Sequence, residues 1–260
     1  MMPPRCRTGA RTMASSTWQV WPDTQGPDLF RDARRAAIPG AEEQVRVLTQ
    51  LASHTVGTDL AVLDLGCGDA VLLHALMREL PIRLGVALDR SPAMLERAQI
   101  RFEELGLLGG LLHFVEADFG EPGWMESLPF RQFDVVVAGY ALADFGAARL
   151  CRLFEDVFAL LRAGGLFVVL DHLPSGRALS RRLLREAWQQ SILSEPCATK
   201  DGVEGERPDK EVPADPALQP PTAEEVVSCL GRAGFSEVDC CWKIYDLMRK
   251  ACRMIRMKPV

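Results

Sequence analysis

Short apolar runs alternate with amphipathic stretches along the middle of the chain. Between the runs, apolar residues recur every three or four positions, which predicts helices near 70–79, 92–105 and 148–161. Strands that alternate with helices form βαβ units, whose strands lie parallel with helices over both faces. The pattern therefore predicts an α/β fold with a doubly wound sheet. Its five strands, each rich in Val, Leu or Phe, are 61–65, 84–88, 111–115, 133–138 and 166–170.

The N-terminal region divides into a polar tail and a helical cap. Residues 1–27 contain arginines but no apolar run of the kind that a secretory signal needs, so we expect a flexible tail. Residues 28–56 repeat apolar side chains at helical spacing on either side of a Pro39-Gly40 break, which predicts a helical cap. We expect residues 28–260 to form a single domain.

The region after the fifth apolar run changes character twice. Residues 194–221 contain six prolines among many charges and few apolar residues, which favours a mobile insertion or lid. Thr222 and Glu225 then form the capping box of a helix over 223–233, and Gly234 follows as its C-cap.

The end of the chain supplies two more segments of strand length. Residues 235–242 and 243–257 can form an antiparallel pair at one edge of the sheet. With the five apolar runs, they bring the expected sheet to seven strands, most of them parallel.

Composition and charge narrow the functional classes. The 260 residues carry 30 Lys and Arg against 35 Asp and Glu, a net charge of −5, which disfavours binding of a phosphate backbone. No stretch approaches the roughly 20 apolar residues of a membrane-spanning helix. The 8 cysteines show no CxxC pair or regular spacing, which indicates mostly reduced thiols in a cytoplasmic protein and predicts no metal site.

The sharpest chemical signal lies where the first strand ends. There an apolar strand runs through Asp64 into a Gly66-Cys67-Gly68 turn, whose glycines let the backbone approach a ligand. A dinucleotide fingerprint would place a third Gly or Ala where this chain has Val71. Asp89 closes the next strand, at the position of a ribose-binding carboxylate. Together these features describe a nucleoside site without a pyrophosphate, so an NAD(P)-dependent oxidoreductase is disfavoured.

Four ordered blocks of this chain resemble the class I S-adenosylmethionine-dependent methyltransferases. The resemblance covers residues 40–175 and implies S-adenosylmethionine as cofactor, a Rossmann-like sheet, and methyl transfer by in-line displacement. The blocks are 62–70, 86–95, 116–119, and 133–145 followed by 160–166.

The resemblance also implies which residues hold the methionine and ribose portions of the cofactor. Asp64, Gly66, Cys67 and Gly68 would cradle the methionine portion, and Asp89 would bind both ribose hydroxyls. Taken alone, a strand-end aspartate such as Asp89 could equally be a helix N-cap.

The adenine side of the cofactor draws on the second and third blocks. Arg90 and Met94 would border the adenine or ribose, and Asp118 and Phe119 would contact the adenine amino group and ring. These residues complete the cofactor-binding set, together with a residue at the end of the fourth strand, Gly139.

Catalytic candidates cluster after the fourth and fifth strands. Gly139 and Tyr140 would line the floor beneath the sulfonium. The family often has Ala-Leu-His-His at the next positions, where this chain has Ala141-Leu142-Ala143-Asp144. The change removes a possible histidine base, and Asp144 joins Tyr140 as a catalytic candidate. His172 is the remaining candidate base, and Asp171 could either support it or touch the acceptor.

The acceptor is expected to be a small molecule, because the chain shows no RNA-binding module or broad basic surface. A tRNA-modifying methyltransferase and a non-catalytic scaffold or activator subunit with the same fold remain alternatives. The Ala138-Gly139-Tyr140-Ala141 sequence lacks the Asn/Asp-Pro-Pro-aromatic motif, which disfavours methylation of nucleobase or glutamine amino groups. We expect a monomer or homodimer.

Overall fold

The computed structural model describes residues 41–55, 59–104, 106, 112–142, 145–171, 173, 177, 179–180, 182–183, 221–243 and 252–257. Three predictions therefore lie wholly or mostly outside the described residues: the tail over 1–27, the insertion over 194–221 and the first part of the cap over 28–56. Two candidate catalytic residues, Asp144 and His172, also lie outside them.

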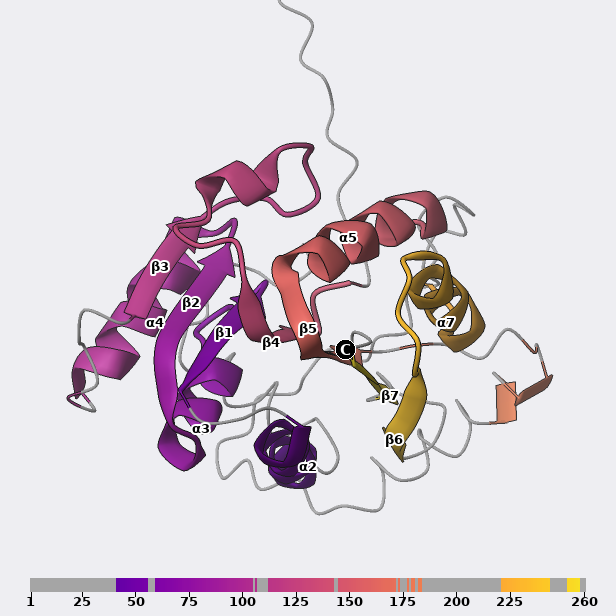
Figure 1. The fold of residues 1–260 in the computed structure, drawn as a ribbon, viewed down its shortest axis with the longest axis horizontal. Helices are drawn as coiled ribbons and strands as arrows, with labels where there is room; N and C mark the ends of the chain where they lie inside the picture. Colours follow the sequence, from indigo (N-terminus) through magenta and orange to yellow (C-terminus); the bar gives the residue numbers. More distant parts are fainter. Residues whose placement is uncertain are drawn as a thin grey trace, which may run out of the picture.

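A single twisted sheet forms the centre of the molecule, in the order β3-β2-β1-β4-β5-β7-β6 (Figure 1). The first five strands pair in parallel, and β7 pairs antiparallel with both β5 and β6. The predicted α/β fold with a parallel sheet is confirmed. The strands are β1 (Leu60–Leu65), β2 (Ile82–Asp89), β3 (Leu112–Glu116), β4 (Phe133–Gly139), β5 (Leu161–Asp171), β6 (Asp239–Lys243) and β7 (Cys252–Met257).

Helices cover both faces of this sheet (Figure 1). One face packs against α2, α3 and α4, and the other against α5, α7 and a short 3-10 helix, η2. This arrangement is the doubly wound architecture that the alternating pattern predicted. The helices are α2 (Ala41–Thr55), α3 (Val71–Glu79), α4 (Pro92–Glu104), η2 (Trp124–Ser127), α5 (Ala147–Leu160) and α7 (Ala223–Arg232).

The central strands are buried on both faces, which is why they read as continuous apolar runs. In β1, Ala61, Leu63 and Leu65 point to the α5 and α7 side, whereas Leu60 and Val62 point to the α2, α3 and α4 side. All five side chains are at most 2% exposed. This burial fixes the register, because a shift of one residue would exchange the two faces.

The starts of β5 and β6 differ from the prediction for identifiable reasons. β5 begins at Leu161 and not at residue 166, because Leu161 already pairs with Phe133 and the register then shifts around a Gly164-Gly165 bulge. β6 begins only at Asp239, because Phe235 turns into the core and stacks on the Phe167 ring.

The predicted capping box is confirmed at the start of α7. The Thr222 side chain accepts a hydrogen bond from the Glu225 N–H, and the Glu225 carboxylate accepts one from the Thr222 N–H. Beyond the helix, Gly234 adopts φ 99°, as expected of the residue after a helix end.

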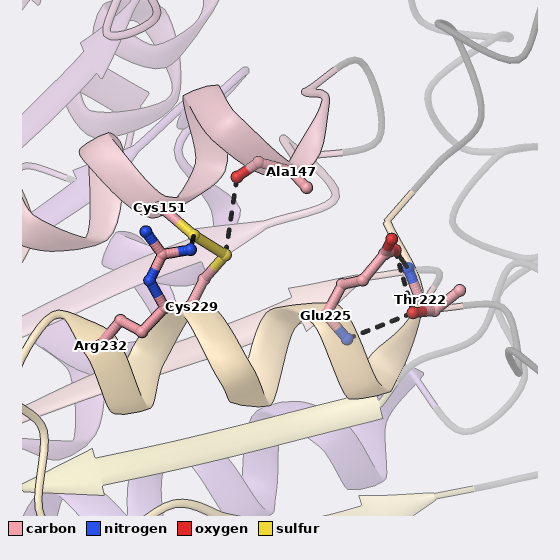
Figure 2. The surroundings of a disulfide bond; sticks show 6 residues. All are labelled: Ala147, Cys151, Thr222, Glu225, Cys229 and Arg232. Carbon is pink, nitrogen blue, oxygen red and sulfur yellow. Dashed lines mark hydrogen bonds between the residues drawn. A yellow bond between two sulfur atoms is a disulfide. The ribbon is translucent and has the colours of Figure 1, made fainter.

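The prediction of mostly reduced thiols did not anticipate one disulfide. Cys151 of α5 and Cys229 of α7 form a disulfide, with an S–S distance of 2.04 Å (Figure 2). The two residues are 78 positions apart, so no spacing motif signalled them. Cys67, which is buried, carries a free thiol.

Candidate functional site

The Gly66-Cys67-Gly68 loop lies at the carboxyl edge of the sheet and is held in a tight turn. The N–H groups of Gly66 and Cys67 both donate to the Leu88 carbonyl, at 2.8 and 2.9 Å. Gly66 adopts φ 70°, and a Cβ there would lie 2.6 Å from the Cβ of Ala141 and 3.1 Å from the Phe119 ring. Only glycine fits both the conformation and the space, so the loop packs directly on the segment after β4.

Asp89 ties the end of β2 to this loop. Its Oδ2 accepts the Gly68 N–H at 2.8 Å, and its Oδ1 accepts the Ser91 N–H at 2.9 Å. Ser91 caps the first turn of α4, because its backbone and hydroxyl oxygens both accept the Met94 N–H. Asp89 is therefore not merely a helix cap, because one of its oxygens crosses to the glycine loop.

Asp64 is a buried carboxylate beneath the loop. Its side chain is 1% exposed, and its Oδ2 accepts the Leu73 N–H at 3.1 Å. Burial above all, with smaller contributions from the nearby carboxylates of Asp89 and Asp69, raises the pKa of Asp64 to about 7 against the lowering effect of the Leu73 N–H. A positive charge bound above the loop would therefore favour the ionised form of Asp64.

The thiol of Cys67 is held neutral in the same place. Burial raises its pKa first of all, and the Asp64 carboxylate adds to the shift. The thiol donates to the Gly68 carbonyl at 3.4 Å. Cys67 is thus part of the loop wall and is not a nucleophile.

A partly buried ion pair that the sequence did not reveal joins the loop to α4. Asp69 is 8% exposed, and its Oδ2 lies 2.6 Å from the Arg101 guanidinium of α4. Arg101 Nε also donates to the Asp69 carbonyl at 3.0 Å. The pair joins the loop to a helix 32 residues further along, a separation at which no short motif could show it.

The turn after β3 brings together three of the predicted cofactor residues. Asp118 Oδ1 accepts the Gly120 N–H at 2.8 Å, and its Oδ2 lies 3.9 Å from Arg90. Phe119 stacks on Phe145, with ring centroids 5.2 Å apart and an interplanar angle of 6°. Phe119 also packs against Gly66, so the turn after β3 and the glycine loop are in direct contact.

The segment after β4 completes this edge. A Cβ at Gly139 would lie 2.5 Å from Leu72 of α3, so the strand end and that helix are in close contact. Tyr140 adopts φ 56°, and its hydroxyl donates to Oε1 of Gln44 in α2 at 2.7 Å. Asp171 is fully buried and its Oδ2 accepts the Leu142 N–H at 2.7 Å, so it supports the backbone of this segment.

The structure thus brings together the ends of β1, β2, β3 and β4 with their predicted residues. Within the described ranges, no group of three His, Cys, Asp or Glu side chains is placed to hold a metal ion. No helix in that part of the chain is long and apolar enough to cross a bilayer. Sequence reasoning missed three residues that reach the site from elements distant in sequence. They are Gln44, which bonds to Tyr140, Arg101, which bonds to Asp69, and Arg149, whose Nη2 lies 3.7 Å from Asp118 Oδ1.

Comparisons with known proteins agree with this geometry. Residues 62–165 match a family model described as a methyltransferase domain. Trans-aconitate 2-methyltransferase of Yersinia pseudotuberculosis serotype O:1b is 31% identical over 172 residues, 64% of this chain and 58% of that protein. Carboxy-S-adenosyl-L-methionine synthase of Campylobacter lari is 24% identical over 149 residues, 57% of this chain and 60% of that protein. The chain spans less than two thirds of the length of these curated relatives.

Solved structures share the fold. An O-methyltransferase family protein from Burkholderia thailandensis superposes with a TM-score of 0.61 at 18% identity, over 91% of this chain and 60% of that one. Human N-acetylserotonin methyltransferase, solved in complex with S-adenosylmethionine, superposes with a TM-score of 0.54 at 19% identity, over 89% and 55%. Residues 62–165 are therefore similar to methyltransferase domains, and one solved structure of the same fold has S-adenosylmethionine bound.

Proposed function

We propose that this protein is a methyltransferase that moves the methyl group of S-adenosylmethionine to a small-molecule acceptor. The observation that carries the proposal is the bond between Gly68 N–H and Asp89 Oδ2, which fixes a ribose-type carboxylate beside a glycine loop. The surroundings of Gly66 leave no space for a side chain at that position. A backbone without a side chain allows a ligand to approach closely. A third small residue for a pyrophosphate is absent at Val71.

In this proposal each wall of the site contacts one part of the cofactor. Asp64 and the glycine loop hold the methionine portion, where the cofactor's positive charge favours the buried carboxylate. Asp89 accepts the ribose hydroxyls. The adenine lies against Arg90, Met94, Asp118 and Phe119, and Gly139 and Tyr140 lie beneath the sulfonium.

For this reaction the protein mainly has to position the acceptor and exclude water. The bound sulfonium supplies an activated methyl group, which an acceptor lone pair takes as the carbon–sulfur bond breaks. The protein's part is to align the acceptor and exclude water. Tyr140 donates its phenolic proton to Gln44, which makes it a poor base as placed. We therefore retain His172 as the proposed base for an acceptor that must lose a proton, and Asp144 as a residue beside the acceptor.

A small acceptor is favoured over RNA by the charge of the chain. A net charge of −5 offers little attraction to a phosphate backbone. The similar proteins include one named for the small tricarboxylate trans-aconitate, which fits the same class of acceptor without identifying it.

The first test is a calorimetric titration with S-adenosylmethionine, S-adenosylhomocysteine, NAD and NADP. The proposal expects micromolar binding of the first two and none of the last two. Protein that binds the cofactor is then incubated with methyl-labelled cofactor and either a small-molecule panel or bulk tRNA. Label on a small molecule supports the proposal and label on tRNA replaces it with the runner-up. Binding without transfer to any acceptor favours the scaffold.

A further inference from the structure

We infer that Arg149 is a positioning residue for the adenine side of the cofactor site. It extends from the first turn of α5 onto the turn after β3 and contacts the backbone, a carboxylate and a ring there. The inference rests on the proposed cofactor site and adds a residue from outside the four blocks that carry the family resemblance.

The contacts of Arg149 bridge two elements that are 29 residues apart. Its Nε donates to the Gly120 carbonyl at 2.8 Å. Its Nη2 lies 3.7 Å from Asp118 Oδ1 and 3.5 Å from Glu121 Oε1. Its guanidinium carbon lies 4.6 Å from the centroid of the Phe145 ring. One side chain thus holds the turn by a hydrogen bond and by charge, and packs on the aromatic residue beside it.

The Phe145 contact continues into the predicted site. Phe145 stacks on Phe119, and Phe119 lies against Gly66 of the glycine loop. Arg149, Phe145 and Phe119 therefore form a stack, in which Arg149 lies farthest from the glycine loop and Phe119 borders it. Movement of Arg149 would release the ring that the proposal places beside the adenine.

Gly120 shows how closely the guanidinium is seated. A Cβ at this position would lie 1.7 Å from Nη2 and 2.2 Å from the guanidinium carbon of Arg149. The arginine therefore occupies the space that any other side chain at residue 120 would need. A glycine here is explained by the arginine and not by the backbone, whose φ is outside the left-handed region.

The same contacts orient Asp118. Its Oδ1 accepts the Gly120 N–H and faces Arg149, so its Oδ2 is turned toward Arg90. A carboxylate in a fixed orientation can accept from an adenine amino group without first losing rotational freedom. Arg149 is about one third exposed, so as an ordinary surface ion pair it would contribute little to folding. Its effect should appear in ligand affinity.

The test compares Arg149→Met with Arg152→Met, an exposed arginine one turn away on the same helix. The ligands are S-adenosylhomocysteine and 5′-methylthioadenosine, which keeps the adenine and ribose but lacks the amino-acid portion. We expect Arg149→Met to weaken both ligands by about tenfold, because Asp118 and Phe119 would have to be ordered when the ligand binds, and Arg152→Met to change neither. Equal binding by Arg149→Met and wild type overturns the inference, and so does a loss confined to S-adenosylhomocysteine.

A double-mutant cycle with Gly120→Ala guards against a general folding defect. The new methyl group should displace the guanidinium and weaken 5′-methylthioadenosine as Arg149→Met does. The double variant should then bind no worse than either single variant, whereas additive losses would overturn the inference. Faster amide hydrogen exchange at residues 118–121 with an unchanged thermal midpoint is the expected signature of a positioning role. Failure of the wild-type protein to bind either ligand would instead count against the proposed function.

Discussion

The carboxyl edge of the sheet and the layer formed by α5 and α7 are held together by different interactions. At the edge, carboxylates accept backbone N–H groups, as Asp89 does from Gly68 and Asp171 from Leu142. In the α5 and α7 layer, apolar side chains pack tightly and a disulfide joins the helices. The first arrangement fixes where polar atoms point, whereas the second resists unfolding. Changes in the two regions should therefore separate into effects on affinity and effects on stability.

The largest expected effect is on the helical layer. The disulfide between Cys151 and Cys229 closes a loop of 78 residues, and loss of that restraint costs about 4.5 kcal/mol by the chain-entropy relation. Urea unfolding of Cys151→Ala/Cys229→Ala should show this fall, and reductant should produce it in the wild type. Affinity for S-adenosylmethionine below the unfolding transition should change less than about twofold, since neither sulfur touches the site.

Cys240→Ser is the matched control for the disulfide, because Cys240 is an exposed cysteine outside the Cys151–Cys229 pair. Its unfolding midpoint should match the wild type with and without reductant. A wild-type midpoint that ignores reductant would mean that the two helices are held by packing alone.

Asp89→Ala should have the next largest effect, and on affinity. The substitution removes the acceptor of the Gly68 N–H as well as the proposed partner of the ribose hydroxyls. Loss of hydrogen bonds to a charged group costs about 2 kcal/mol, or more than about tenfold in dissociation constant. Calorimetry with S-adenosylmethionine measures it. Glu116→Ala is the control, because Glu116 pairs with Asp89 across β3 and β2 but is exposed. Unchanged binding by Asp89→Ala would remove the ribose assignment.

The pKa of Asp64 gives a smaller, pH-dependent effect. Burial raises this pKa from 3.8 to about 7 in the folded protein, so the folded state binds the proton more tightly than the unfolded chain. The contribution of this group to stability is therefore full below about pH 4 and is lost as the pH rises to about 7. Binding has the opposite sign, because a cationic ligand prefers the ionised carboxylate.

Calorimetry at two pH values tests the Asp64 effect on binding. Affinity for S-adenosylmethionine should rise about fivefold between pH 6 and pH 7, as ionisation of one group near pH 7 requires. In Asp64→Asn the rise should disappear. A rise that persists in this variant would assign the titration to another group.

The two regions also differ in how far the sequence predicts them. Buried parallel strands read as apolar runs, and Asp64, Gly66 and Asp89 lie at the ends of such runs, so the edge and its loop could be located. The disulfide could not, because its partners are 78 residues apart and the two helices pack only in the folded chain. Arg149 was missed for the same reason: it contacts Gly120 only in the folded chain, where its guanidinium occupies the space of a side chain at residue 120.

The smallest predicted effect concerns the contact between α2 and the edge. The Tyr140 hydroxyl donates to Gln44, a side chain 2% exposed and 96 residues away. Tyr140→Phe takes one donor from a buried amide, which should lower the free energy of unfolding by about 1 kcal/mol. Replacing both groups, in Tyr140→Phe/Gln44→Leu, should recover part of that loss. The double variant no longer buries the amide oxygen that accepts the Tyr140 hydroxyl. Urea unfolding of Tyr140→Phe, Gln44→Leu and the double variant checks this order. If the double variant were less stable than either single one, the hydroxyl and the amide would act separately, and α2 would be held to the edge by its apolar face alone.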